Sequence, residues 1–153
     1  MTIEQEIKSN VKMDEAKKII LNIMFNQNLI SDKFNELMKP YDLSSEQYNV
    51  LRILRGQNQN PINMCTIQER MIAKNSNTTR LIDKLLIKKL VTRNVCKFNR
   101  RKIEIKITDL GLQLLSDLDP KVIENELYYS QNLNQSEQQQ LNHLLEKYRT
   151  FTT

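Results

Sequence analysis

Residues 75–108 read NSNTTRLIDKLLIKKLVTRNVCKFNRRKIEIKIT, and this stretch decides the fold of the chain. Its first half, up to Lys89, opens with polar residues that commonly begin helices and continues with apolar residues at helical spacing. On a helical wheel, Leu81, Ile82, Leu85 and Leu86 share one side, and the opposite side is polar and basic. The pattern predicts an amphipathic helix with a polar outer face.

The second half predicts two strands, from Val91 to Cys96 and from Lys102 to Thr108. In the second strand, Ile103, Ile105 and Ile107 alternate strictly with charged residues, which is typical of a strand with one buried face. A short basic tip, residues 97–101, joins the two strands. A helix followed at once by a basic hairpin is typical of a winged helix, and it suits a DNA groove and the phosphates beside it.

The charge of the chain is concentrated in the same region. Residues 70–106 hold 12 of the 23 Lys and Arg residues but only 2 of the 18 Asp and Glu residues. The rest of the chain has 11 basic and 16 acidic residues, so the net charge of +5 is a basic centre in an acidic frame. This asymmetry favours a phosphate-binding face over the alternative, a solvated charged surface without a partner.

The bulk properties limit the class of protein. At 153 residues, the chain can form one domain with helical extensions. No segment approaches about 20 uninterrupted apolar residues. The acidic N-terminus also lacks the basic-then-apolar layout of a signal peptide. We therefore expect a cytoplasmic protein with no membrane span, in which Cys65 and Cys96 form no structural disulfide.

Helices are predicted on both sides of the basic centre. A long helix runs from a cap at Asp14 to about Lys39 and is ended by Pro40. Its apolar stripe could pack on its own chain or bury against a second copy. Downstream, Thr108 caps a helix that Pro120 should bend or split. A last amphipathic helix follows another capping sequence and carries Leu141, Leu144, Leu145 and Tyr148.

Two further helices precede the basic centre. Ser44-Ser-Glu-Gln47 is a capping box that opens the first of them, and Gly56 ends it. Asn63 caps the second, which is short and leads by a tight turn into the helix after Asn75. Two short helices joined in this way, the second with a polar outer face, form a helix-turn-helix.

Several segments in this order carry a family pattern. Residues 43–51 read LSSEQYNVL, residues 79–85 TRLIDKL and residues 90–93 LVTR, while NRR at 99–101 is followed by ITDLG at 107–111. They resemble the L-[ST]-x-x-Q-[FY]-x-[VL]-L helix, the T-R-L-[VI]-D-x-L recognition helix and the D-R-R…L-T-x-x-G wing of the MarR-type family of bacterial transcriptional regulators. The similarity covers roughly Tyr41 to Leu118. Lys89 stands where the family has a glycine, and Asn99 where it has an aspartate.

The resemblance implies a mainly α (α+β) fold, a winged helix-turn-helix with a two-stranded wing and N- and C-terminal dimerisation helices. It divides the chain into an N-terminal dimerisation helix (1–40), a DNA-binding region (41–108) and C-terminal dimerisation helices (109–153) within one intertwined domain. It implies a homodimer that binds a palindromic operator in double-stranded DNA, as a repressor in our interpretation. A small aromatic or anionic ligand, or cysteine oxidation, would release such a protein.

The predicted DNA-binding residues lie on the polar helix face and on the wing tip. Amide and guanidinium groups can read base edges, whereas Thr and Lys more often hold phosphates. The basic tip would contact the backbone or the minor groove. The predicted set is Ser76, Asn77, Thr79, Arg80, Lys84, Lys97, Arg100, Arg101 and Lys102.

Other chemistry is weakly indicated. Cys65, in the first turn of its helix, and Cys96, at the end of a wing strand, are candidates for a redox switch, although a small structural residue explains Cys65 equally well. His143 has no partners at metal-ligand spacing, so no metal or cofactor is expected. No phosphate loop, nucleophile elbow or zinc signature is present, which argues against an enzyme. The alternatives to a ligand-released regulator are a thiol-based redox sensor and a winged helix that only binds other proteins.

Overall fold

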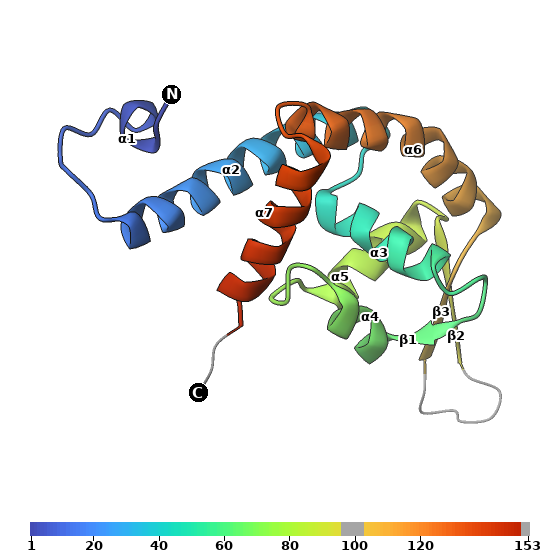
Figure 1. Ribbon diagram of the computed structural model, residues 1–153. Coiled ribbons are helices and arrows are strands. Elements are labelled where there is room, and N and C mark those ends of the chain that lie inside the picture. The colour runs from blue at the N-terminus through green and yellow to red at the C-terminus, as the bar shows by residue number, and fades with distance from the viewer. Residues whose placement is uncertain (96–102, 151–153) are drawn as a thin grey trace. The chain divides into compact units, whose positions relative to one another are not determined.

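The computed structural model describes residues 1–95 and 103–150, which form two compact units, Met1–Asp117 and Leu118–Thr153. The first unit contains the winged helix (Figure 1). Its helices are α3 (Ser45–Arg55), α4 (Met64–Arg70) and α5 (Thr78–Ile87). Its strands are β1 (Ile62–Asn63), β2 (Val91–Val95) and β3 (Ile103–Ile107). The predicted winged helix-turn-helix is therefore confirmed.

The strands form one antiparallel sheet in the order β1-β3-β2. Val91 pairs with Ile107 and Val95 with Ile103, which is the predicted two-stranded wing. The sequence did not indicate β1, whose Ile62 pairs with Ile105 on the other edge of β3. Strand β1 directly precedes α4 and pairs with β3 of the wing. The sheet therefore connects the segments before and after the helix-turn-helix.

The core of the winged helix is built from the apolar faces that the helical spacing predicts. Its fully buried side chains come from all three helices and from β3, and they include Leu51, Leu54, Ile67, Met71, Ile82, Leu85 and Ile105. On α5, the buried Ile82 and Leu85 lie on the side opposite to the exposed Arg80 and Lys84. Burial of the apolar face fixes α5 and leaves its polar face outward.

The helix starts follow the capping signals. The Ser44 hydroxyl accepts a hydrogen bond from the Gln47 amide at 3.2 Å, and the Gln47 side-chain oxygen accepts one from the Ser44 amide at 3.0 Å. The Asn63 side chain accepts from the Thr66 amide at 2.9 Å. Both caps satisfy backbone donors that the first turn of a helix leaves unpaired. They fix where α3 and α4 begin, and both predicted caps are confirmed.

Upstream of the winged helix lie α1 (Ile3–Glu6), α2 (Glu15–Met38) and the short 3-10 helix η1 (Lys39–Tyr41). The Asp14 side chain caps α2 as predicted. The C-terminal part of α2 packs on α3, where the rings of Phe34 and Tyr48 meet edge to face with centroids 5.2 Å apart. Only Met38 is buried along α2, so most of its apolar stripe stays exposed.

Helix α6 (Asp109–Ser130) begins in the first unit and ends in the second. The Thr108 hydroxyl accepts a hydrogen bond from the Gly111 amide at 3.1 Å, which confirms the predicted cap. A bend or a split was expected at Pro120. The split is wrong, because α6 continues through Pro120 and tolerates the loss of the backbone hydrogen bond that proline cannot donate.

The second unit ends with α7 (Gln135–Tyr148), which opens with the predicted capping box between Asn134 and Glu137. The apolar residues predicted on this helix, Leu141, Leu144, Leu145 and Tyr148, are exposed. Within the described ranges, no helix combines the length and the apolar character that crossing a bilayer requires.

Candidate nucleic-acid interface

The polar face of α5 gathers most of the predicted DNA-binding residues that the structure describes. Ser76, Asn77, Arg80 and Lys84 line one shallow hollow, together with Ser44 and Glu46 from the start of α3. Thr79 is exposed and faces a neighbouring hollow between α4 and the start of α5. The hydroxyl, amide, guanidinium and ammonium groups of this face are the types that contact phosphates and base edges.

Asn77 also has a structural role, which its sequence context does not distinguish from the predicted DNA contact. It is the N-cap of α5, and its side-chain oxygen accepts a hydrogen bond from the Arg80 amide at 3.0 Å. A bidentate contact with adenine requires both the oxygen and the amino group of an amide. With the cap in place, one of the two acceptor positions of the Asn77 oxygen is already occupied.

An ion pair connects α5 to the first wing strand. Arg93 of β2 lies 2.7 Å from the carboxylate of Asp83, which is on the outer side of α5. Both side chains are partly exposed, so the pair contributes at most about 1 kcal/mol to stability. Its structural effect is to pair the acidic group of Asp83 with a basic one on the outer side of α5.

The wing tip lies outside the described residues, and with it lie Lys97, Arg100, Arg101, Lys102 and Cys96. The strands that carry the tip are described. Strand β2 ends at Val95 and β3 begins at Ile103, and these two residues pair with each other. The assignment of the tip to DNA backbone or minor groove stays a prediction.

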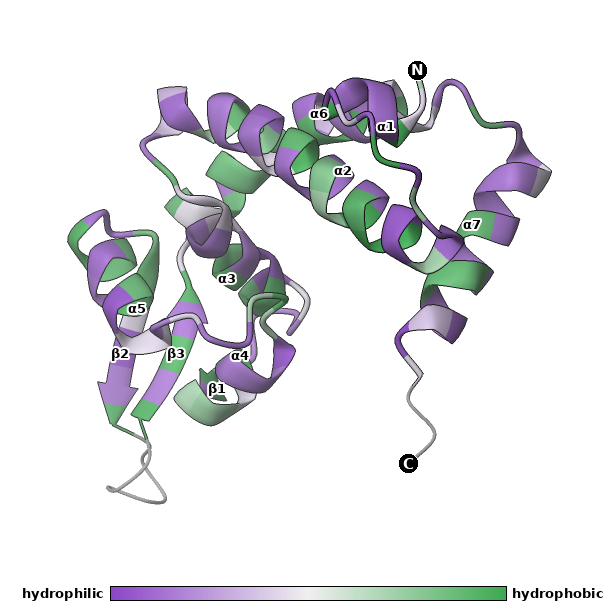
Figure 2. Ribbon diagram, turned by 90° about the vertical axis from the view of Figure 1, so that its left-hand side faces the viewer, coloured by the Kyte–Doolittle hydropathy of each residue, from purple (hydrophilic) through white to green (hydrophobic). Residues whose placement is uncertain are grey.

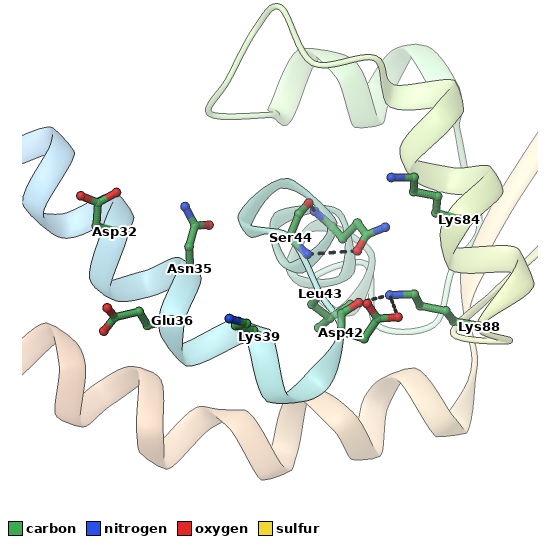
Figure 3. Close-up of a pocket in the computed structure, with 10 residues that line it drawn as sticks. Asp32, Asn35, Glu36, Lys39, Asp42, Leu43, Ser44, Lys84 and Lys88 are labelled. Carbon is green, nitrogen blue, oxygen red and sulfur yellow. Dashed lines mark hydrogen bonds and ion pairs between the residues drawn. The ribbon is translucent and has the colours of Figure 1, made fainter.

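A larger hollow lies between the end of α2, the start of α3 and the outer side of α5 (Figure 3). Its volume is about 880 Å³. Its lining is almost entirely polar and charged: Asp32, Asn35, Glu36, Lys39, Asp42, Leu43, Ser44, Gln47, Lys84 and Lys88. Lys84 borders both this hollow and the hollow on the polar face of α5, so one side chain is shared by the two surfaces.

Asp42 and Lys88 close one side of this hollow. The ammonium group of Lys88 lies 2.8 Å from the Asp42 carboxylate and also donates to the Asp42 backbone carbonyl. The hydrogen bond and the charge of Lys88 lower the pKa of Asp42 below its ordinary value. The sequence does not indicate this pair, because its members are 46 residues apart and no local pattern joins them.

The remaining candidates are placed as follows. Cys65 is exposed in α4 and lines the hollow of about 490 Å³ beside Asn77 and Thr79. Its redox role stays a prediction. Among the described residues, no three His, Cys, Asp or Glu side chains are grouped so that they could hold a metal ion.

Comparison with known proteins shows which family the chain is similar to. Residues 43–103 match the MarR family model. The chain is 24% identical over 107 residues to the HTH-type transcriptional regulator MhqR of Bacillus subtilis (strain 168). The aligned region covers 70% of this chain and 72% of MhqR.

Solved structures agree. A MarR transcription factor from Planctomyces limnophilus is 29% identical and superposes with a TM-score of 0.69 over 89% of this chain and 98% of its own. A cysteine-to-serine mutant of E. coli MarR, solved in complex with operator DNA, is 24% identical, with a TM-score of 0.76 over 90% of this chain and 100% of its own. Both MhqR and the Planctomyces limnophilus protein are described as transcription regulators. Together, the match over residues 43–103 and the shared fold support a MarR-family winged helix-turn-helix transcriptional regulator.

Proposed function

We propose that this regulator is a homodimeric repressor that binds a palindromic operator, with α5 of each copy in the major groove. The observation that carries the proposal is the outward face of α5, where Ser76, Asn77, Arg80 and Lys84 meet in one hollow. The stretch of sequence that contains α5, residues 70–106, holds 12 basic and 2 acidic residues. In a helix-turn-helix, the residues near the start of the second helix contact base edges, which supports a reading role for this face.

A second copy is proposed because α2 and the C-terminal helices leave their apolar residues uncovered. Ile19, Ile20, Ile23, Met24, Leu29 and Ile30 of α2 are exposed, as are Leu141, Leu144 and Leu145 of α7. Apolar surface of this extent is a common sign of a protein interface. Two copies related by a two-fold axis would present two α5 helices with the same symmetry. A palindromic operator has this two-fold symmetry, so each α5 could contact one half-site. Residues 1–40 and 109–153 would then act as the dimerisation helices.

Release by a small ligand is proposed at the hollow of about 880 Å³ that Figure 3 shows. It lies between α2, which belongs to the proposed dimerisation region, and α5, which belongs to the reading surface. The lining holds three lysines and three acidic residues, so its charges balance and both an anionic and an aromatic ligand stay candidates. Such a ligand would act by binding one arrangement of α2 and α5 more tightly than another.

The experiment is a salt titration of binding to two duplexes, one selected by the protein from random sequences and one with the same bases shuffled. We expect a steep loss of affinity with salt on both duplexes, because phosphate contacts release counterions. Arg80→Ala should cost roughly 1–3 kcal/mol on the selected duplex and less on the shuffled one. Arg101→Ala should weaken both duplexes alike and flatten the salt slope by about one unit.

The matched control is Lys12→Ala, which removes one positive charge at an exposed position outside the basic stretch. It should leave both affinities and the salt slope unchanged. Salt-independent binding, or no binding, would contradict the proposal and favour the alternative in which the winged helix binds only other proteins. If Arg80→Ala and Arg101→Ala behave identically on both duplexes, α5 is not the reading helix.

A further inference from the structure

Gln68 lies where the two helices of the helix-turn-helix meet. Its side chain projects half-buried from α4 and makes two hydrogen bonds. Its amino group donates to the backbone carbonyl of Lys74, in the turn, at 2.6 Å. Its oxygen accepts from the hydroxyl of Thr78, the first residue of α5. One amide therefore joins α4, the turn and the start of α5.

The partners of Gln68 are themselves close to the reading residues. Thr78 is only 4% exposed and sits between Asn77, which caps α5, and Thr79. Two more hydrogen bonds stabilise the turn. The Lys74 ammonium donates to the Glu69 carbonyl, and the Ser76 hydroxyl donates to the Ala73 carbonyl. The backbone that carries Ser76, Asn77 and Thr79 is thus fixed by side-chain contacts within the helix-turn-helix itself.

We propose that Gln68 is a positioning residue for operator reading, which sets the location of the first turn of α5 without touching DNA. The inference rests on the proposed function, because it assigns a role in reading by that helix. A side chain that reads a base edge must be held within about 0.5 Å and 10–20° of its productive geometry. Phosphate contacts by long basic side chains are less sensitive to such shifts. Loss of the Gln68 contacts should therefore reduce sequence discrimination more than overall affinity.

The polarity of the two contacts makes this role specific to glutamine. One end of the amide must donate to a carbonyl and the other must accept from a hydroxyl, which a carboxamide does and a carboxylate does not. In Gln68→Glu, the Thr78 hydroxyl can still donate, but an oxygen would face the Lys74 carbonyl. In Gln68→Met, both contacts are lost at similar length and without a change of charge.

Discrimination is measured as the ratio of affinities for the selected and shuffled duplexes. We expect this ratio to fall roughly tenfold for Gln68→Met and for Thr78→Val, within the range that one lost base contact causes. Thr78→Ser keeps the hydroxyl and should keep the ratio. Gln57→Glu is the matched control for charge, because Gln57 is also half-buried and donates to the Ile53 carbonyl, at the end of α3. It should keep the ratio that Gln68→Glu loses.

Hydrogen exchange without DNA gives a readout that does not depend on reading. The amides of Thr78 and Arg80 donate to the Ser76 carbonyl and to the Asn77 cap, respectively. They should exchange faster in Gln68→Met and Thr78→Val than in the wild type, by more than the change in the urea midpoint of the whole domain accounts for. The double variant should show no larger effect than either single one, since both substitutions remove the same link.

The outcomes separate the two proposals. If the wild type binds without discrimination, the proposed function fails, and the exchange rates still decide whether Gln68 fixes the start of α5. If the wild type discriminates but Gln68→Met keeps both the ratio and the exchange rates, the positioning role is overturned. A fall in the ratio with unchanged exchange would also overturn it, because Gln68 would then contact DNA directly. If Gln68→Met does not fold, Thr78→Val against Thr78→Ser makes the same decision.

Discussion

Helices α5 and α2 each carry an apolar stripe, but the stripe is buried in α5 and mostly exposed in α2. In α5, Ile82 and Leu85 are fully buried against the winged helix. In α2, a helix of 24 residues, Met38 alone is buried, and Ile20 and Met24 are 50% and 57% exposed. Figure 2 shows hydrophobic residues interleaved with polar ones along α2.

The difference indicates what kind of partner each helix has. The apolar side of α5 is satisfied within its own unit, so its polar side is the one that is available to a charged, hydrophilic partner such as DNA. The apolar side of α2 is not covered within its own unit, and in the proposed dimer a second copy would cover it. Helical spacing alone gives both stripes and does not distinguish the two outcomes.

The largest effect is expected from a charge placed in the stripe of α2. Ile23→Glu should raise the dissociation constant of the dimer at least about 100-fold, because burying an unpaired carboxylate costs several kcal/mol. Operator affinity should fall with it, since one copy reaches only one half-site. Sedimentation at micromolar concentration should give about twice the chain mass of 18.2 kDa for the wild type and the single mass for the variant.

The control is Asn28→Glu, which places the same carboxylate at an exposed position on the opposite side of the helical wheel of α2. It should remain dimeric. A monomeric wild type, or equal dissociation in both variants, would remove the contrast between α2 and α5.

A smaller effect is expected at the end of α5, where the chain turns into the wing. Lys89 adopts a left-handed backbone conformation, with φ of 59°. This position is held by a hydrogen bond from the Thr108 hydroxyl to the Lys89 carbonyl at 2.8 Å. A side chain in this conformation costs roughly 1 kcal/mol relative to glycine. Lys89→Gly should therefore stabilise the fold by about 0.5–1 kcal/mol, measured as a higher urea midpoint.

Lys89→Ala separates the backbone effect from the loss of charge, since it removes the ammonium but keeps the strained Cβ. It should give no gain in the urea midpoint. Equal stabilisation by both substitutions would mean that the charge, and not the conformation, is the cause. The departure from the family's glycine would then carry no conformational cost.

The sequence predicted the features whose signals are local. The capping boxes at Ser44 and Asn134 and the cap at Asn63 lie within four residues of the groups they satisfy, so they could be assigned to the residue. Strand β1 could not be predicted, because two residues have no period and its pairing with β3 depends on the folded chain. The polar face of α5 likewise followed from helical spacing.

The contacts that adjust this face could not be predicted. Gln68 and Thr78 are ten residues apart and on different helices, and nothing in their neighbourhood marks them as a pair. The cap at the start of α5 is similar, since Asn77 fits a base-reading role and a capping role equally well in the sequence. Only the distance from its oxygen to the Arg80 amide assigns the second role.

The smallest effect is expected from the ion pair that ties the end of α5 to the turn between α2 and α3. The Lys88 ammonium lowers the pKa of the Asp42 carboxyl from its ordinary value of 3.8. A carboxyl whose pKa is depressed by folding adds stability above its unfolded pKa, and that stability is lost as the pH falls through the folded value. The contribution is therefore complete at neutral pH and declines below about pH 3.8.

Asp42→Asn tests this contribution with little other change, because Asp42 has φ of 52° and asparagine tolerates the left-handed region. The variant should be slightly less stable than the wild type at pH 7, and this deficit should shrink at pH 3, when urea midpoints are compared. Lys88→Met, which keeps the aliphatic stem, should give the same pattern, and the double variant should be no worse than either one. An Asp42→Asn deficit that persists unchanged at pH 3 would show that the side chain acts through the turn and not through its charge. The end of α5 would then be held by packing alone, as its buried face is.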